Sequence, residues 1–463
     1  MKRIRYYFIL TAFCCAACDF GSTNVDPGNL TDASLSLMLP GAEMQAAYNI
    51  GALGGRMPGI VMQHWAGNDA QQLAYTSYNI GESDMNNLWN AGLYGGVMKD
   101  AKIMIEKAEE QGNPYYVGIG KVLMAHALGV CTSMWGDIPY SQALDIDQYP
   151  KPVFDTQEEV YNAVQTLLSE AIVEFSKPAY VAPVPPGGDD LYFGGNASAW
   201  IKVAHSLKAR YYLHLTMKDA ASAQNALDEI AAGAIAGNDD EPVCPFASAQ
   251  NNANPYYLFG IQRPNTMVMA PSFVDLLTDN ADPRKSKLLH SNNVSYFNAS
   301  NDDLYWVQAD AGLPLISYSE IKFIEAEALL RTGDAPGAEA ALALAIEANM
   351  DRLGVDGTAY MATRGNFLGL TTDEERLQRI VEEKYVSMYA QAETEVWVDY
   401  RRTGYPAITP APNGTAGGLN PGGLVPRRFL YPINERTTNE DNYNAAVQNQ
   451  GGNLMNVALW AFN

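Results

Sequence analysis

The sequence has few cysteines, which excludes a small fold held together by disulfides. Only five occur in 463 residues, and Cys14, Cys15 and Cys18 stand near the N-terminus. The remaining two, Cys131 and Cys244, are too few for a disulfide framework. We expect both to be buried free thiols, and the sequence leaves open whether they form a single bridge.

Positive charge is also scarce. The chain has 30 Lys and Arg residues against 52 Asp and Glu residues, a formal net charge of −22, and only 18% of its residues are charged. This negative field repels phosphate backbones and anionic lipids, so we expect no nucleic-acid partner. Because 47% of the residues are hydrophobic, the chain is expected to be globular.

Motifs of common catalytic and metal sites are missing. The five histidines include no pair at metal-ligand spacing, and no phosphate-binding loop or nucleophile elbow occurs. We therefore predict no enzyme and no cofactor. A structural calcium ion stays possible at Asp189-Asp190 or Asp239-Asp240-Glu241, although neither has the EF-hand pattern. Two other classes also stay open: a glycoside hydrolase with a hidden carboxylate pair, and a protein-interaction scaffold.

Long hydrophobic runs are absent, but a short one occupies residues 6–17 after Lys2, Arg3 and Arg5. It is shorter than the roughly 20 residues that span a bilayer, which predicts a signal peptide over residues 1–17. Small residues precede Cys18, as a lipoprotein signal peptidase requires. We expect an acylated Cys18 and a lipidated tether over 18–30. The alternative is an ordinary signal peptide followed by an incidental cysteine.

Helical periodicity dominates the remaining chain, residues 31–463, and predicts one mostly α domain. Helical hairpins are expected at about 115–232 and 317–400, and a loop-rich insert at about 237–314. Small residues on two facing helices of 317–350 are typical of tetratricopeptide-like pairs. The pattern further predicts an irregular loop over 51–81 and one long helix over about 373–399.

Aromatic residues are abundant, with 27 Tyr, 14 Phe and 7 Trp. Rings beside amides and carboxylates suit sugars, because a sugar ring has apolar C–H faces and a fringe of hydroxyls. Segment 64–78 has this mixture, and anchoring of the loop is the alternative function of its rings. The predicted ligand-binding residues are Trp65, Asn68, Asp69, Tyr75, Tyr78, Asn86 and Trp89, with Tyr256, Tyr257, Tyr305 and Trp306 in the insert.

Two further clusters of aromatic and charged residues are interpreted as structural. Gly136 and Pro139 are expected to end a helix, and Trp135 is expected to pack beneath the next helix. Trp397 to Arg402 are expected to serve core packing and ion pairing near the end of a helix.

Several segments together resemble the SusD/RagB family of nutrient-binding outer-membrane lipoproteins, particularly its second large branch. They are NVDP at 24–27, WGDIPYSQA at 135–143, FDTQEEVY at 154–161, WIKVAHSLKAR at 200–210, DPR at 282–284, EEKY at 382–385, EVWVDYRRTG at 395–404 and PRRFLYP at 426–432. One departure is His205, where the family motif favours Asn, and we expect only a local packing change there.

The resemblance implies a SusD-like α-superhelix with tetratricopeptide-like helix pairs and a loop-rich variable half. It also implies a lipid anchor at the cell surface, in the outer membrane, and a partner, a SusC-like TonB-dependent transporter that receives the ligand. A glycan or oligosaccharide is the expected nutrient, and a peptide or another nutrient is the alternative.

Overall fold

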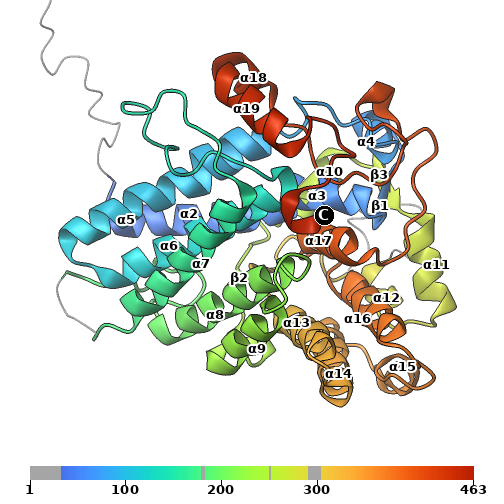
Figure 1. Cartoon of the computed structure of the whole chain (residues 1–463). Helices are drawn as coiled ribbons and strands as arrows, with labels where there is room; N and C mark the ends of the chain where they lie inside the picture. Colours follow the sequence, from blue (N-terminus) through green and yellow to red (C-terminus); the bar gives the residue numbers. More distant parts are fainter. Residues whose placement is uncertain (1–32, 179–182, 250–251, 290–303) are drawn as a thin grey trace, which may run out of the picture.

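The computed structural model describes residues 33–178, 183–249, 252–289 and 304–463. The predicted signal peptide, Cys18 and the tether lie outside the described residues. Helices dominate the described part, and its strands form two short two-stranded sheets (Figure 1). The prediction of a mostly α fold is confirmed.

The helices fall into three consecutive groups. The first group holds α2 (Leu35–Gly51), α3 (Leu53–Val61), α4 (Ala70–Thr76), η3 (Asn87–Met98), α5 (Lys99–Gln111), α6 (Pro114–Trp135), α7 (Gln157–Phe175), α8 (Ala197–His214) and α9 (Ser222–Gly233). The insert holds η4 (Asn238–Asp240), α10 (Pro255–Gln262), α11 (Pro271–Asp279) and α12 (Lys285–Leu288). The last group holds α13 (Tyr318–Arg331), α14 (Ala335–Leu353), α15 (Thr358–Arg364), α16 (Asp373–Ser387), α17 (Glu393–Thr403), η6 (Ala416–Gly418), α18 (Ile433–Thr438), α19 (Glu440–Gln450) and η7 (Trp460–Phe462).

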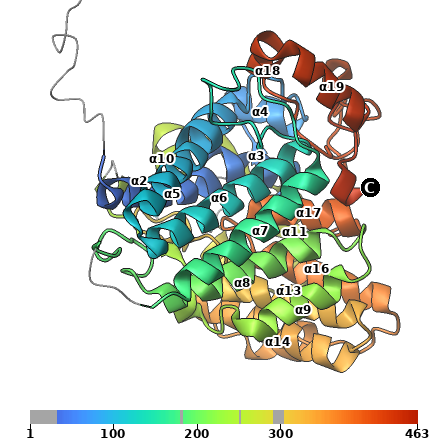
Figure 2. The same ribbon diagram turned by 60° about the vertical axis from the view of Figure 1, so that its left-hand side comes forward.

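Successive helices pack side by side as hairpins. The pairs α6–α7, α8–α9 and α13–α14 follow one another across the molecule in two views (Figures 1 and 2). In α13–α14 the small residues Ala326, Ala338, Ala341 and Ala345 are buried between the helices. Small side chains let two helices approach closely, so this part of the sequence pattern predicts the observed packing.

Helix α6 lies at the centre of the core. It is the one helix among the described residues that is long and apolar enough to cross a membrane, and 94% of its apolar window is buried inside the protein. Gly136 ends it with a φ of +85°, and Trp135 is fully buried, as predicted. The apolar surroundings of this helix are therefore supplied by the protein's own core.

Side-chain caps fix the starts of several helices. Thr156 accepts a hydrogen bond from the Glu159 amide, and Glu159 in return accepts from the Thr156 amide, which forms a capping box at α7. Asn196 caps α8 in a similar way. Such caps satisfy amides that have no partner within the helix.

Two predictions of local structure are wrong. Residues 51–81 are not one irregular loop, because they contain α3, the strand β1 (Trp65–Gly67) and α4. The helix expected over 373–399 is two helices, α16 and α17, separated at Ala390, whose φ is +57°. At this break the Ala390 amide donates to Glu393 Oε1 over 2.6 Å, and His64 contacts Glu393 Oε2 at 2.5 Å.

The insert joins the predicted binding segment through strand pairing. Strand β1 pairs antiparallel with β3 (Met267–Met269), with Trp65 opposite Met269. Strands β2 (Val243–Cys244) and β4 (Leu313–Pro314) pair at the two ends of the insert. The insert is therefore more regular than predicted, and it holds segment 64–78 against the helical body.

Candidate functional site

Trp65 lies in the core and not at the surface. Its side chain is 1% exposed, its Nε1 donates to Tyr389 Oη over 3.1 Å, and its ring centroid lies 5.4 Å from that of Tyr256. Gly59 of α3 is needed beside it, because a Cβ at residue 59 would lie 2.3 Å from the indole ring. The prediction that Trp65 offers an exposed surface for stacking is therefore wrong. Its ring anchors the segment to the core, which was the alternative.

Tyr75 and Tyr78 are also buried, so they present no exposed ring. The Tyr75 hydroxyl donates to Asp84 Oδ1 over 2.8 Å, and the Tyr78 hydroxyl accepts from the Ala411 amide over 3.1 Å. These contacts tie segment 64–78 to residues 81–84 and to the loop after α17.

The exposed part of the segment is mostly polar, although Leu73 is 52% exposed. Asn68 and Asp69 are both exposed. Asn68 Nδ2 donates to the carbonyl of Asn265 over 3.1 Å, and Asp69 caps α4 through the Ala70 amide at 2.7 Å. We call the exposed residues Asn68, Asp69, Gln71, Arg263 and Asn265 the loop surface. It offers amide, carboxylate and guanidinium groups to a ligand.

The remaining predicted residues are dispersed. Trp89 is buried and donates to Glu435 Oε1 over 3.2 Å, while Asn86 before it is partly buried. Tyr256 and Trp306 are buried, and Tyr257 and Tyr305 are partly exposed. The structure thus brings Trp65 and Tyr256 together inside the core, and it does not gather the predicted rings into one exposed site.

The charged end of α17 is a buried ion-pair network, as predicted. Arg402 contacts Glu327 through two bonds of 2.8 and 2.9 Å and Asp399 over 2.7 Å, and Lys384 contacts Asp399 over 2.8 Å. Burial alone would raise the pKa of Glu327, but Arg402 and Arg331 outweigh burial and lower that pKa. These motif residues stabilise the fold and are closed to a ligand.

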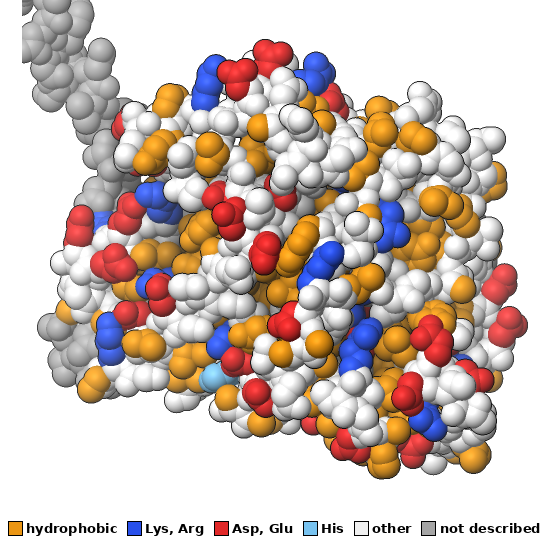
Figure 3. Space-filling model, viewed as in Figure 1, with side chains coloured by type: hydrophobic (Ala, Val, Ile, Leu, Met, Phe, Trp, Pro, Cys, Tyr) orange, Lys and Arg blue, Asp and Glu red, His pale blue; other side chains and the backbone are white. Residues whose placement is uncertain are grey.

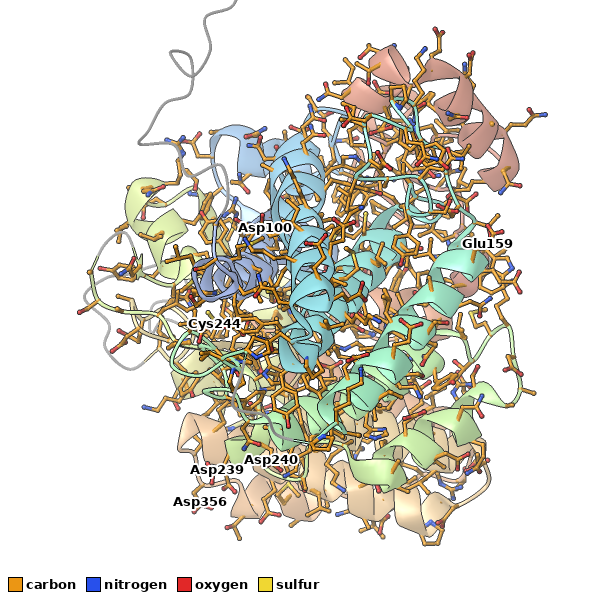
Figure 4. The ribbon with its side chains drawn as sticks, turned by 90° about the vertical axis from the view of Figure 1, so that its left-hand side faces the viewer. Asp100, Glu159, Asp239, Asp240, Cys244 and Asp356 are labelled. Carbon is orange, nitrogen blue, oxygen red and sulfur yellow. The ribbon has the colours of Figure 1, made fainter. Side chains whose placement is uncertain are left out.

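The candidate calcium ligands already have protein partners. Asp190 accepts hydrogen bonds from Trp200 Nε1 over 2.9 Å and the Gly195 amide over 2.8 Å. Asp240, near the edge of the molecule in Figure 4, pairs with Lys202 at 2.7 Å. Within the described ranges no three His, Cys, Asp or Glu side chains are arranged to hold a metal ion.

The described histidines and cysteines have structural environments. His64, His126 and His214 are buried, and burial together with Arg210 lowers the pKa of His126 to about 3. His205, the departure from the family motif, contacts Glu229 of α9 at 2.7 Å. His290 lies outside the described residues. Cys131 and Cys244 are buried free thiols, as predicted.

An internal cavity of about 30 Å³ lies between α2, α6, α8 and α17. Its polar lining includes Asn49, His126, Arg210, Glu393 and Glu395. A cavity of this size holds roughly two water molecules, so it cannot take a nutrient.

An open groove of about 220 Å³ lies at the surface between α2 and η3. Its lining consists of Gln45, Tyr48, Asn49, Ala52, Leu53, Asn87, Leu88, Ala91 and Gly92. No motif in α2 or η3 indicated this combination. A signal was nevertheless present, since Tyr48 and Gln45 lie on neighbouring turns of α2.

The helix pairs, the insert joined to them by strand pairing and the exposed loop surface define a class of helical-repeat proteins with one loop-bearing half. A family model described as "SusD-like_2: Starch-binding associating with outer membrane" matches residues 27–432. The chain belongs to this SusD-like family, which confirms the resemblance. A search of curated proteins gave no match.

Solved structures share the fold over nearly the whole chain. A SusD homolog from Bacteroides uniformis is 21% identical, with a TM-score of 0.78, and the match covers 93% of this chain and 100% of that one. A SusD/RagB family protein from Bacteroides thetaiotaomicron is 23% identical, with a TM-score of 0.74 and coverages of 93% and 99%. A chitin-binding SusD homolog from Flavobacterium johnsoniae is 20% identical, with a TM-score of 0.76 and coverages of 92% and 98%.

Proposed function

We propose that this protein is a lipid-anchored, cell-surface glycan-binding protein that captures an oligosaccharide and delivers it to a SusC-like TonB-dependent transporter. The family match over residues 27–432 carries the proposal, since its description joins starch binding to the outer membrane. The signal-peptide pattern before Cys18 supports a position on the membrane. The protein binds the glycan without cleaving it and needs no cofactor.

The loop surface is proposed as one contact region for the ligand. Asn68 and Asp69 are exposed and lie next to Asn265, so one glycan segment can meet amide groups from both β1–α4 and the insert. Tyr257, Tyr305 and Asn86 are partly exposed and stay separate proposed contacts for the ligand. Trp65 is buried beneath the loop surface and holds β1 in place. A Trp65 variant that no longer binds the ligand would therefore indicate a disrupted fold and not a lost ligand contact.

The first test measures binding with the protein starting after Cys18. Starch oligosaccharides, chitin oligosaccharides and neutral plant polysaccharides are titrated in affinity gels and by calorimetry, with a peptide mixture as the alternative class. We expect saturable binding of a glycan without new reducing ends. Binding of peptides alone would contradict the glycan proposal, and glycan turnover would favour a glycoside hydrolase.

The loop surface is tested by Asn68→Ala combined with Asn265→Ala. Removal of two exposed amides is expected to lower glycan affinity about tenfold, because a hydrogen bond contributes about 0.5–1.5 kcal/mol. The control is Asn444→Ala, another exposed asparagine, on α19. Equal affinities in the double variant and the control would contradict a role for the loop surface while leaving glycan binding intact.

A further inference from the structure

Close packing of α2 against η3 fixes the shape of the groove between these two helices. Asn49 Nδ2 donates to the Gly92 carbonyl over 2.8 Å, and Gln45 Nε2 donates to Asn49 Oδ1 over 2.8 Å. A Cβ at Gly92 would lie 2.5 Å from Asn49 Oδ1, and one at Gly96 would lie 3.0 Å from Gln45 Cγ. Because glycines are required at both contacts, the two helices and the amides between them are fixed before any ligand arrives.

The rim of the groove combines one ring with amides. Tyr48 is 42% exposed and Asn87 is exposed, while Gln45 is partly exposed. Within the described residues, the Tyr48 hydroxyl has no hydrogen-bond partner. An exposed ring next to amides recognises a ligand with an apolar face and surrounding hydroxyls. A sugar ring has both features.

The lining also excludes one class of sugar. No charged side chain lines the groove, and the protein carries a net charge of −22. A uronic acid or a sulfated sugar would lose hydration there without gaining a counter-charge. The groove therefore suits an uncharged ring.

Size limits the occupant to a short segment. The volume of about 220 Å³ lies below the roughly 300–1,000 Å³ of pockets that enclose drug-sized ligands. Helix η3 also supports a functional role for the groove, because it is a π-helix, and π-helical turns occur frequently at functional sites.

We propose that the groove formed by Gln45, Tyr48 and Asn87 is a subsite for a single uncharged sugar ring. The sugar ring lies against the ring of Tyr48, and the sugar hydroxyls form hydrogen bonds with the side-chain amides of Gln45 and Asn87. This inference rests on the glycan-binding function proposed above, and it adds a site separate from the loop surface and a selectivity for neutral sugars.

The experiment uses saturation-transfer NMR on the protein starting after Cys18. The probes are the methyl glycosides of glucose, galactose, mannose and N-acetylglucosamine, each against methyl glucuronide. The variants are Tyr48→Ala, Asn87→Ala and Ala91→Leu, the last of which fills the groove from its rim without removing a contact. The control is Leu37→Ala. Leu37 is an exposed residue of α2, the helix that carries Tyr48, and it lies eleven positions and therefore about 16 Å from Tyr48.

We expect the parent protein to bind at least one neutral glycoside. The affinity for that glycoside should fall about fivefold to tenfold in Tyr48→Ala, and in Leu37→Ala it should stay within about twofold of the parent protein. Ala91→Leu should weaken binding similarly, and circular dichroism checks the fold of each variant. Oligosaccharide binding that is unchanged in all three groove variants would overturn the subsite and leave the proposed function standing. Equal binding of the glucuronide would overturn the selectivity. A parent protein that binds no glycan in any assay would instead overturn the proposed function, and the subsite with it.

Discussion

At the scale of single residues, burial decides the charge of Glu43 in helix α2. Its side chain is 0% exposed, and its Oε2 accepts a hydrogen bond from the Leu191 amide over 2.8 Å. Burial raises the pKa of Glu43 to about 10, and the neighbouring Asp190 carboxylate adds to this rise. Glu43 is therefore protonated at neutral pH, and the Leu191 amide that donates to its Oε2 joins α2 to the loop before α8.

This protonation predicts a pH dependence of stability. The native state keeps the Glu43 proton up to a pKa of about 10, whereas the unfolded chain releases it above about pH 4.3. The native state then binds more protons than the unfolded state, so this group lowers the free energy of unfolding as pH rises between these values. Glu43→Gln should remove that contribution.

The measurement is urea unfolding at about pH 6 and about pH 9. The difference in unfolding free energy between the two pH values should be smaller in Glu43→Gln than in the parent protein. Glu106→Gln is the control, since the Glu106 side chain is 57% exposed. An identical pH difference in the parent and in Glu43→Gln would mean that Glu43 is ionised in the native protein.

At the scale of helices, glycines set how closely two elements cross. Gly129 of α6 lies against Tyr211 of α8, and a Cβ at residue 129 would lie 2.2 Å from Tyr211 Cζ. Gly41 in α2 is different, because no atom lies within 4 Å of the place where its Cβ would be. The same substitution therefore has opposite effects at these two positions.

Gly129→Ala should destabilise the protein by about 1–3 kcal/mol, because the extra methyl group forces α6 and α8 apart. Gly41→Ala, the matched control, should stabilise it by up to about 1 kcal/mol, because alanine has the higher helix propensity. Thermal and urea unfolding measure both. Equal effects of the two variants would contradict the close α6–α8 crossing.

Helix boundaries show which elements local sequence can predict. The capping box at Thr156 and the small residues of α13–α14 are local signals, and they predicted helices that the structure confirms. The break between α16 and α17 was not predicted, since the helical pattern continues through it. It coincides with the contact of Glu393 with His64, a residue 329 positions away. No local pattern records such a contact.

At the scale of the whole molecule, the face shown in Figure 3 carries no dominant patch of one charge among its described residues. Acidic and basic side chains are interspersed with apolar ones over the face in Figure 3. A protein with this surface and a net charge of −22 gains little from anionic lipid. The proposed attachment to the membrane therefore depends on the lipid at Cys18.

Cys18→Ala tests this attachment in the native host. The substitution should move the protein out of the outer-membrane fraction, because an acyl chain contributes about 0.8 kcal/mol of membrane affinity per buried CH₂ group. Immunoblots of membrane and soluble fractions, with metabolic labelling by a fatty acid, give the readout. Cys131→Ala is the control. A Cys18→Ala protein that stays in the membrane fraction would contradict the anchor.

Sequence alone determined the fold class, the family and most of the helical pairs. These follow from periodicity, caps and short motifs, which are local and survive in the order of residues. It also indicated that the motif residues near Trp135 and Trp397 are structural.

Only the tertiary structure decided which polar and aromatic residues reach solvent. Trp65 and Asn68 stand three positions apart, yet one is buried and the other exposed, because β3 and Tyr389 cover one of them. Tyr48, which carried no motif, lines a groove because η3 packs on α2 through glycines. Exposure depends on contacts between distant segments, and those contacts exist only after the chain has folded.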